Sequence, residues 1–136
     1  MNEALTRLEF LCNIIPAKLK AFSEEVFSHK PAPAKWSKKE TTGHLVDSAA
    51  NNIQRFVRMQ YENTPYIIYA QNEWVNLQHH QNKNSAELIQ LWELLNRHII
   101  HVLKFLKNIL TKFSFIFHFL QFPGIPHEGW EIHFSA

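Results

Sequence analysis

The chain has 136 residues, a length typical of one domain that buries about two-thirds of its unfolded surface. Its 14 basic and 12 acidic side chains leave a net charge of +2, which excludes the single-sign field of a dedicated nucleic-acid binder. The one cysteine, Cys12, cannot form an internal disulfide and is expected to be a small buried hydrophobe. The first residues, Met-Asn-Glu-Ala, lack the basic and apolar regions of a secretion signal, and we expect a cytoplasmic protein.

The first predicted helix covers residues 3–28. Apolar residues recur there in steps of three and four, as in an amphipathic helix that buries one side. They are Leu5, Leu8, Cys12, Ile15, Leu19, Phe22 and Val26. Pro16 interrupts the pattern and removes a backbone donor, which predicts a kink or a short break. The helix should end before Pro31, because a residue that precedes proline avoids the α region.

The second predicted helix, residues 37–61, begins at a capping box formed by Ser37 and Glu40. Trp36 precedes this box and is expected to pack back onto the first turn. Because residues advance by about 100° along a helix, one ridge of this helix is polar and the opposite stripe is apolar. The ridge contains Glu40, His44, Asp47, Asn51 and Arg55, and the apolar stripe includes Leu45, Ala49, Ile53 and Phe56. The ridge faces either solvent or a functional site, and periodicity alone does not distinguish the two.

The segment from Pro65 to Lys83 is predicted to be a loop with a short helix at residues 73–79. Within it we interpret the pair His79 and His80 as surface residues. A third long helix, residues 84–107, opens with another capping pair, formed by Asn84 and Glu87. One face of that helix carries Leu88, Leu91, Leu95, His98, Val102 and Phe105.

Residues 108–136 differ in character from the rest of the chain and form an atypical tail. Seven of the eleven phenylalanines lie in residues 105–136. Their strict alternation between Phe113 and Phe119 is typical of a strand and not of a helix, and the run is too short to span a membrane.

Several short motifs resemble the DinB-like superfamily, which includes the thiol-dependent S-transferases that use bacillithiol or mycothiol. The motifs are Lys30-Pro31-Ala32-Pro33, Trp36-Ser37-x-x-Glu40, Gly43-His44-Leu45-x-Asp47, Glu73-Trp74-Val75 and Leu91-Trp92-x-Leu94-x-Asn96-Arg97-His98. They cover roughly residues 1–106. The resemblance implies a single all-α domain of the antiparallel four-helix-bundle type, with an activity of the metal-dependent transferase or hydrolase class. Against that family pattern, the fourth helix is missing from residues 108–136 or replaced by another element.

The resemblance also implies where the site lies. The family's equivalent of His44 is a metal ligand on the second helix, and Asp47 on the same face is expected to hold the other ring nitrogen. In the family the remaining two ligands form a His-x-x-x-His pair on the fourth helix, and this chain has no such pair. Its C-terminal histidines are His118, His127 and His133. His98 is a further candidate, as a pocket residue, and the catalytic groups are left open.

Two function hypotheses follow. The first is an enzyme that uses a divalent ion, zinc or nickel, together with a low-molecular-weight thiol, on a small-molecule substrate. The alternative is a catalytically silent helical bundle that acts by self-association or partner binding, since a bundle without its fourth helix leaves an apolar groove. We expect a homodimer, and neither a nucleic acid nor a membrane as partner.

Overall fold

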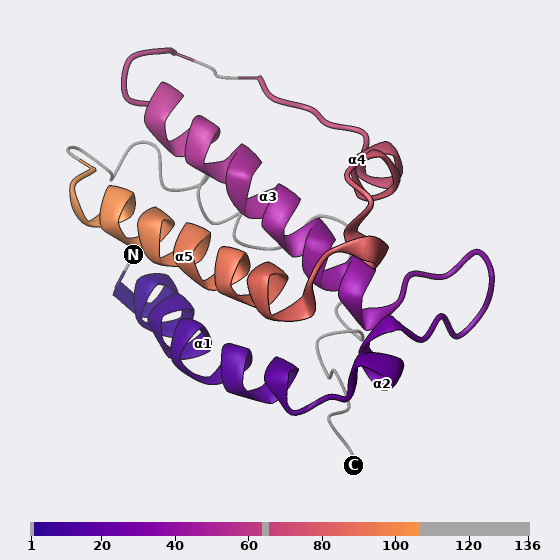
Figure 1. Cartoon of the computed structure of the whole chain (residues 1–136). Helices are drawn as coiled ribbons and strands as arrows, with labels where there is room; N and C mark the ends of the chain where they lie inside the picture. The colour runs from indigo at the N-terminus through magenta and orange to yellow at the C-terminus, as the bar shows by residue number, and fades with distance from the viewer. Residues whose placement is uncertain (1, 64–65, 107–136) are drawn as a thin grey trace. The chain divides into compact units, whose positions relative to one another are not determined.

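The structure is a computed structural model that describes residues 2–63 and 66–106. Its elements are α1 (Asn2–Lys20), α2 (Glu24–Ser28), α3 (Lys38–Arg58), α4 (Gln71–Leu77), the 3-10 helix η1 (His80–Asn82) and α5 (Ser85–Lys104), shown in Figure 1. In these two ranges the chain is mostly helical and has no strand, so the all-α prediction is confirmed. None of the helices described is long and apolar enough to cross a membrane.

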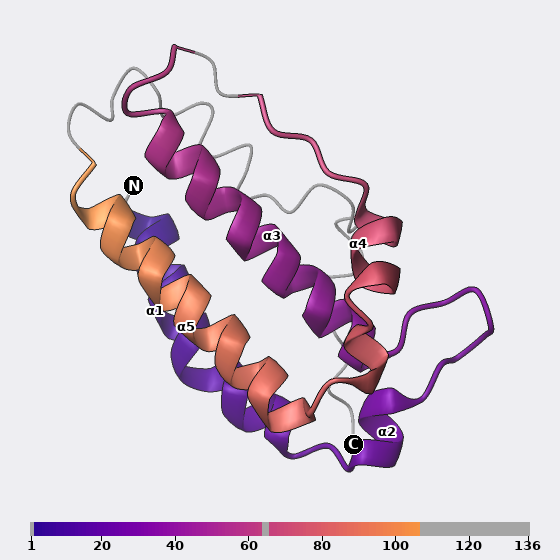
Figure 2. The same cartoon turned by 45° about the horizontal axis from the view of Figure 1, so that its top comes forward.

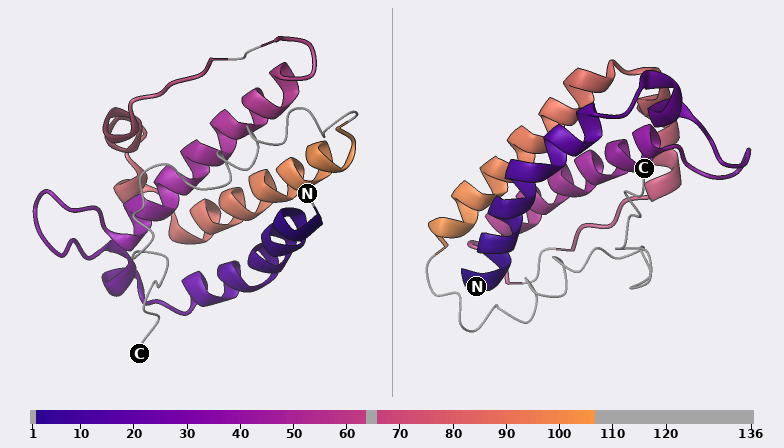
Figure 3. Two further views of the ribbon diagram at one scale, coloured as in Figure 1. Left: turned by 180° about the vertical axis from the view of Figure 1, so that it is seen from behind. Right: turned by 90° about the horizontal axis from the view of Figure 1, so that it is seen from below.

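The long helices α1 and α3 both pack against α5, which lies between them (Figures 1 and 2). The starts of α3 and α5 lie at the same end, because Glu24 accepts hydrogen bonds from both Lys39 and Ser85. Helix α1 runs the opposite way, because Arg97 of α5 contacts Asn13, and Lys104, later in α5, contacts Glu9, earlier in α1. The connection that contains α4 therefore returns along α3 (Figure 3).

This arrangement differs from a simple antiparallel bundle, because α3 and α5 run in the same direction. The predicted four-helix bundle is not confirmed, and the position of a fourth helix falls in residues 107–136, outside the residues described. The predictions of an atypical tail and of its alternating phenylalanines fall there as well.

The predicted helix over residues 3–28 is divided into two. Helix α1 continues through Pro16 to Lys20, so a break at this proline was a wrong prediction. Pro16 is buried, and the packing of α1 on α5 offsets the single backbone hydrogen bond that proline removes. The break lies instead at residues 21–23, after which the Oγ of Ser23 accepts a hydrogen bond from the amide of Val26 and caps α2.

Both predicted helix caps are confirmed. The amide of Glu40 donates to Ser37 Oγ at 3.0 Å, and the amide of Ser37 donates back to the Glu40 carboxylate at 2.9 Å. The amide of Glu87 donates to Asn84 Oδ1 at 3.0 Å. The observed helices α3 and α5 begin one residue after their predicted starts and end three residues before their predicted ends.

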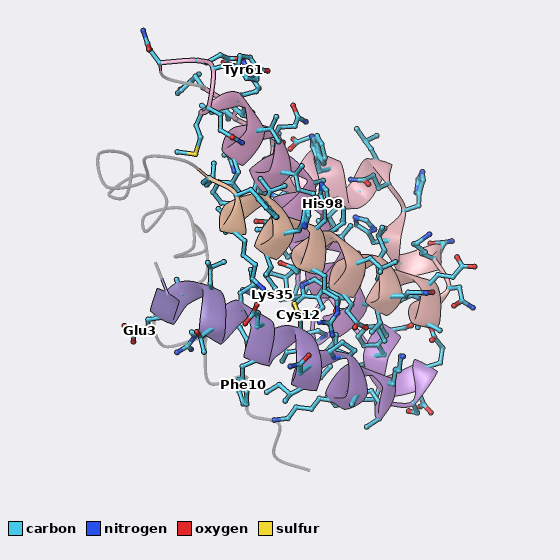
Figure 4. The ribbon with its side chains drawn as sticks, turned by 90° about the vertical axis from the view of Figure 1, so that its left-hand side faces the viewer. Glu3, Phe10, Cys12, Lys35, Tyr61 and His98 are labelled. Atoms are coloured by element: carbon cyan, nitrogen blue, oxygen red, sulfur yellow. The ribbon has the colours of Figure 1, made fainter. Side chains whose placement is uncertain are left out.

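The core lies between the three long helices. It is centred on Val46 of α3 and on Leu88 and Trp92 of α5. Side chains from α1, α3 and α5 pack around this centre: Leu11, Ile15, Leu45 and Leu95. Figure 4 shows the two sides of α1, where Cys12 is 1% exposed, as predicted, and Phe10 is 58% exposed.

Glu24 joins the starts of three helices and provides a pH-dependent contribution to stability. Hydrogen bonds from Lys39, Ser85 and Ser28 lower the pKa of its carboxyl from an ordinary 4.5 to about 2. A pKa lowered by folding stabilises the folded state above the ordinary pKa, and this contribution is lost as the pH falls toward the lowered value. We expect wild type to be more stable than Glu24→Gln above pH 4.5, with a difference that shrinks as the pH falls to about 2.

Urea denaturation from pH 2 to pH 7 measures this difference, with Glu25→Gln as the matched control. Glu25 lies on the same short helix, is exposed and makes none of the three hydrogen bonds of Glu24. A difference between wild type and Glu24→Gln that does not change with pH contradicts the assignment.

Candidate functional site

The polar ridge of α3 faces the protein interior. His44 is 6% exposed and Asp47 is 1% exposed, although both side chains are polar. The segment that contains α4 and η1 packs on α3 and contributes to this burial. Of the two readings that periodicity left open, a solvated ridge is thereby excluded. Burying such groups carries a free-energy cost unless they are hydrogen-bonded, so their partners define the site.

Asp47 is the centre of the hydrogen-bond network. Its two carboxylate oxygens lie 3.1 and 3.2 Å from Nε2 of His80, which is 3% exposed. Its Oδ1 also accepts a hydrogen bond of 2.6 Å from the side-chain amide of Gln78. The residue between these two partners, His79, has a φ of 53° in the left-handed region, where histidine is enriched among non-glycine residues.

Gly43 allows the His80 ring to approach α3. A Cβ atom at position 43 would lie 2.2 Å from Cγ of His80 and 2.7 Å from its Cβ. Distances this short do not occur between real atoms, so only glycine at this position leaves room for the imidazole as placed. The helix thus has a small residue next to His44 because another side chain occupies the space.

Aromatic rings surround His44. The ring centroid of His44 lies 5.1 Å from that of Trp36 and 6.4 Å from that of Tyr69. Tyr69 in turn lies 5.1 Å from Trp74 of α4. Trp36 therefore lies against the first turns of α3, as expected from its place before the cap. These rings keep water away from the imidazole, and burial lowers the pKa of His44 below its ordinary value.

Two ring nitrogens in the cluster have no hydrogen-bond partner. They are Nδ1 of His44 and Nδ1 of His80, and both atoms are buried. Burial also raises the pKa of Asp47, while the neighbouring His80 and the hydrogen bond from Gln78 act in the opposite direction. A buried imidazole nitrogen without a hydrogen-bond partner is an unusual feature, because most buried polar atoms are paired.

The three residues singled out in the sequence differ in their surroundings. His44 and Asp47 lie one turn apart in the same buried ridge. The hydrogen bonds of the Asp47 side chain go to His80 and Gln78, however, and not to His44, the imidazole it was expected to orient. His98 lies on the exposed side of α5, where its ring stacks on that of His101 with centroids 6.2 Å apart (Figure 4). His118, His127 and His133 fall outside the residues described.

Sequence reasoning missed His80, which it interpreted as a surface residue, and the contributions of Gln78 and Gly43. One signal was present for Gly43, since an isolated glycine inside a helical pattern often marks a close approach by another group. For His80 the only signal was a run of polar side chains, Gln78 to Asn82, in a connection without periodicity. Such a run is also typical of a solvated loop.

The side chains of His44, Asp47 and His80 offer nitrogen and oxygen atoms of the type that divalent transition metals bind. Neutral imidazole nitrogens bind zinc and nickel well, and the lowered pKa of His44 keeps its ring neutral at pH 7. Within residues 2–63 and 66–106, no group of three or more histidine, cysteine, aspartate or glutamate side chains is arranged to hold a metal ion. The described residues thus provide individual ligands and not a complete three-ligand set.

Comparison of the chain with protein-family models, with curated proteins and with solved structures finds no match. The resemblance to the DinB-like superfamily thus stays a prediction based on the motifs around Trp36, His44 and Trp92. What the chain does must be argued from the cluster of His44, Asp47 and His80.

Proposed function

We propose that the protein is a metal-dependent enzyme of the transferase or hydrolase class, similar to the DinB-like thiol S-transferases, with His44 as a metal ligand. The observation that supports this proposal best is the buried Nδ1 of His44, which has no hydrogen-bond partner. A divalent ion bound there would lower the pKa of a coordinated thiol or water and so supply a nucleophile at neutral pH.

The surrounding residues have roles that fit this proposal. The rings of Trp36 and Tyr69 exclude water from His44, which strengthens electrostatic interactions in the site. Burial raises the pKa of Tyr69, so its hydroxyl keeps its proton and can donate a hydrogen bond at neutral pH. Asp47 carries the negative charge that favours a cation, and Gln78 fixes the orientation of its carboxylate.

Replacement of His44 by alanine tests the proposal. We expect the purified wild-type protein to bind about one zinc or nickel ion per chain, and His44→Ala to lose this ion, because an imidazole ligand is removed. Elemental analysis and isothermal titration calorimetry measure the stoichiometry and affinity. His29→Ala is the matched control, since His29 is exposed at the end of α2.

Three results are then informative. An ion lost only in His44→Ala supports the proposal. A wild-type protein that binds neither metal contradicts it, and so does an ion that is retained by His44→Ala with unchanged affinity. Circular dichroism on both variants ensures that loss of binding is not loss of fold.

A second candidate function, association of two copies, is favoured by an exposed stripe on α5. Leu91, Leu94, His98, His101 and Phe105 form this α5 stripe, in steps of three and four residues. Leu94 is 57% exposed and Phe105 is 70% exposed. The ring centroids of His101 and Phe105 lie 5.1 Å apart. A helix face of this kind packs well against an identical face of a second copy, which fits the predicted homodimer.

Replacement of Leu94 by aspartate tests this association. We expect wild type to dimerise and Leu94→Asp to dimerise at least about tenfold more weakly, because a charge enters an apolar contact. Sedimentation equilibrium measures the dissociation constant. Leu77→Asp is the control, as Leu77 is 75% exposed on α4 and lies outside the α5 stripe. A wild-type protein that stays monomeric, or equal weakening by both variants, contradicts the role of the stripe.

A further inference from the structure

His80 is held more tightly than its position in a connection requires. It is the first residue of η1, it is 3% exposed, and its ring occupies the space that a side chain at Gly43 would fill. The same short segment is tied to α3 and α2 by Gln81, which accepts a hydrogen bond from Ser37 Oγ and donates one to the carbonyl of Ser28. The chain is therefore anchored on both sides of His80, by Gln78 before it and by Gln81 after it, and this fixes the position of the imidazole.

An ionised Asp47 determines which ring nitrogen of His80 carries the proton. An ionised carboxylate only accepts hydrogen bonds, so Nε2 of His80, which lies 3.1 and 3.2 Å from the two oxygens of Asp47, carries the proton. In a neutral ring the other nitrogen, Nδ1, then holds a lone pair. That atom is buried and accepts no hydrogen bond. An unpaired buried polar atom carries a desolvation cost, which a ligand at Nδ1 would recover.

A carboxylate that holds one nitrogen of an imidazole while the other is free is the arrangement that orients metal-binding histidines. We propose that His80, held by Asp47, is the second imidazole of the site at His44 and binds the same divalent ion through Nδ1. This inference rests on the proposed function. Imidazole donors select a borderline-soft ion such as zinc or nickel and not magnesium or calcium, which prefer oxygen ligands. Two imidazoles leave further positions for a thiol or water.

The sequence suggested that Asp47 orients the imidazole of His44. In the proposed site it orients His80 instead, which lies 36 positions after His44. Gln78 supports the same carboxylate, because its N–H donates to Oδ1, one of the two oxygens that lie within 3.2 Å of Nε2 of His80. Gly43 is part of the same arrangement, because the imidazole reaches Asp47 only across the bare backbone at that position.

Nuclear magnetic resonance of the protein labelled with ¹⁵N-histidine tests the inference directly. Before metal is added, we expect His80 to be protonated at Nε2 and bare at Nδ1. Addition of zinc should shift the Nδ1 resonances of both His44 and His80 at one equivalent. In calorimetry, His80→Gln should weaken zinc binding by at least about 10- to 100-fold, because this is the loss when only a residue that supports a ligand is removed, and His80 is itself a ligand in the proposal. His79→Asn is the control. His79 is the exposed neighbour of His80, and asparagine tolerates the left-handed backbone conformation at that position.

The outcomes separate this inference from the proposed function. If wild type binds no zinc, both are overturned. If zinc binds and is lost with His44→Ala, but the His80 resonances do not shift and His80→Gln binds as wild type, only the role of His80 is overturned. Because the resonances are read in the wild-type protein, the test holds even if His80→Gln fails to fold.

Discussion

Replacement of Gly43 by alanine is expected to destabilise the protein by at least about 2 kcal/mol, although alanine is the better helix former by about 1 kcal/mol. The added Cβ would lie 2.2 Å from Cγ and 2.7 Å from Cβ of His80. The second distance involves an atom next to the backbone, so rotation of the His80 side chain cannot relieve the overlap. The η1 segment must then move away from α3, and His80 loses its hydrogen bond with Asp47.

A double-mutant cycle separates this overlap from other effects of the substitution. Urea denaturation of Gly43→Ala, His80→Ala and the double variant gives the coupling free energy. We expect Gly43→Ala to cost less stability in the His80→Ala background than in wild type, because the ring is gone and only the overlap with the Cβ at position 80 is left. A Gly43→Ala protein that is more stable than wild type contradicts the close packing of His80 on α3.

Replacement of Asp47 by alanine is expected to cost about 1–3 kcal/mol of stability, since it leaves the buried Nε2 of His80, 3.1 Å from Asp47, without an acceptor. The side-chain amide of Gln78, which donates to Asp47 at 2.6 Å, belongs to an exposed residue and can bond to water instead. Asp47→Asn should cost less, because its amide oxygen still accepts one hydrogen bond. It should also move the proton of His80 from Nε2 to Nδ1, since the amide nitrogen of asparagine is a donor.

Urea denaturation at pH 7 measures both variants, and the ¹⁵N resonances of His80 report the position of its proton. Gln54→Ala is the control for changes in helix propensity, as Gln54 is exposed on the same helix. If Asp47→Ala loses no more stability than this control, the carboxylate does not hold the two donors together.

The predictions that succeeded depend on interactions between residues close in sequence. The caps at Ser37 and Asn84 join residues three apart. The face predicted for residues 84–107 was right only in part, since Leu88 is buried but Leu91 and Phe105 are 38% and 70% exposed. The predicted break at Pro16 was wrong for a related reason. Local geometry disfavours a proline inside a helix, but the packing of α1 on α5 offsets that cost, and this packing is not visible in a local pattern.

The candidate site was predicted in part. The motif Gly43-His44-Leu45-x-Asp47 and the spacing along one helix identified two polar residues of one ridge. Their burial depends on a segment about 30 residues later in the chain, and that segment also contains His80, the partner of Asp47. No periodicity links positions 47 and 80, because the connection between them is irregular over most of its length.

The sequence by itself determined that the chain is helical, where α3 and α5 begin, and that His44 and Asp47 share one ridge of a helix, because these features follow from contacts within one or two turns. Only the tertiary structure decided that this ridge is buried, that α3 and α5 run in the same direction, and that Asp47 holds His80. Those features depend on how a connection without a repeating pattern folds back onto α3, and a local pattern carries no information about such a contact.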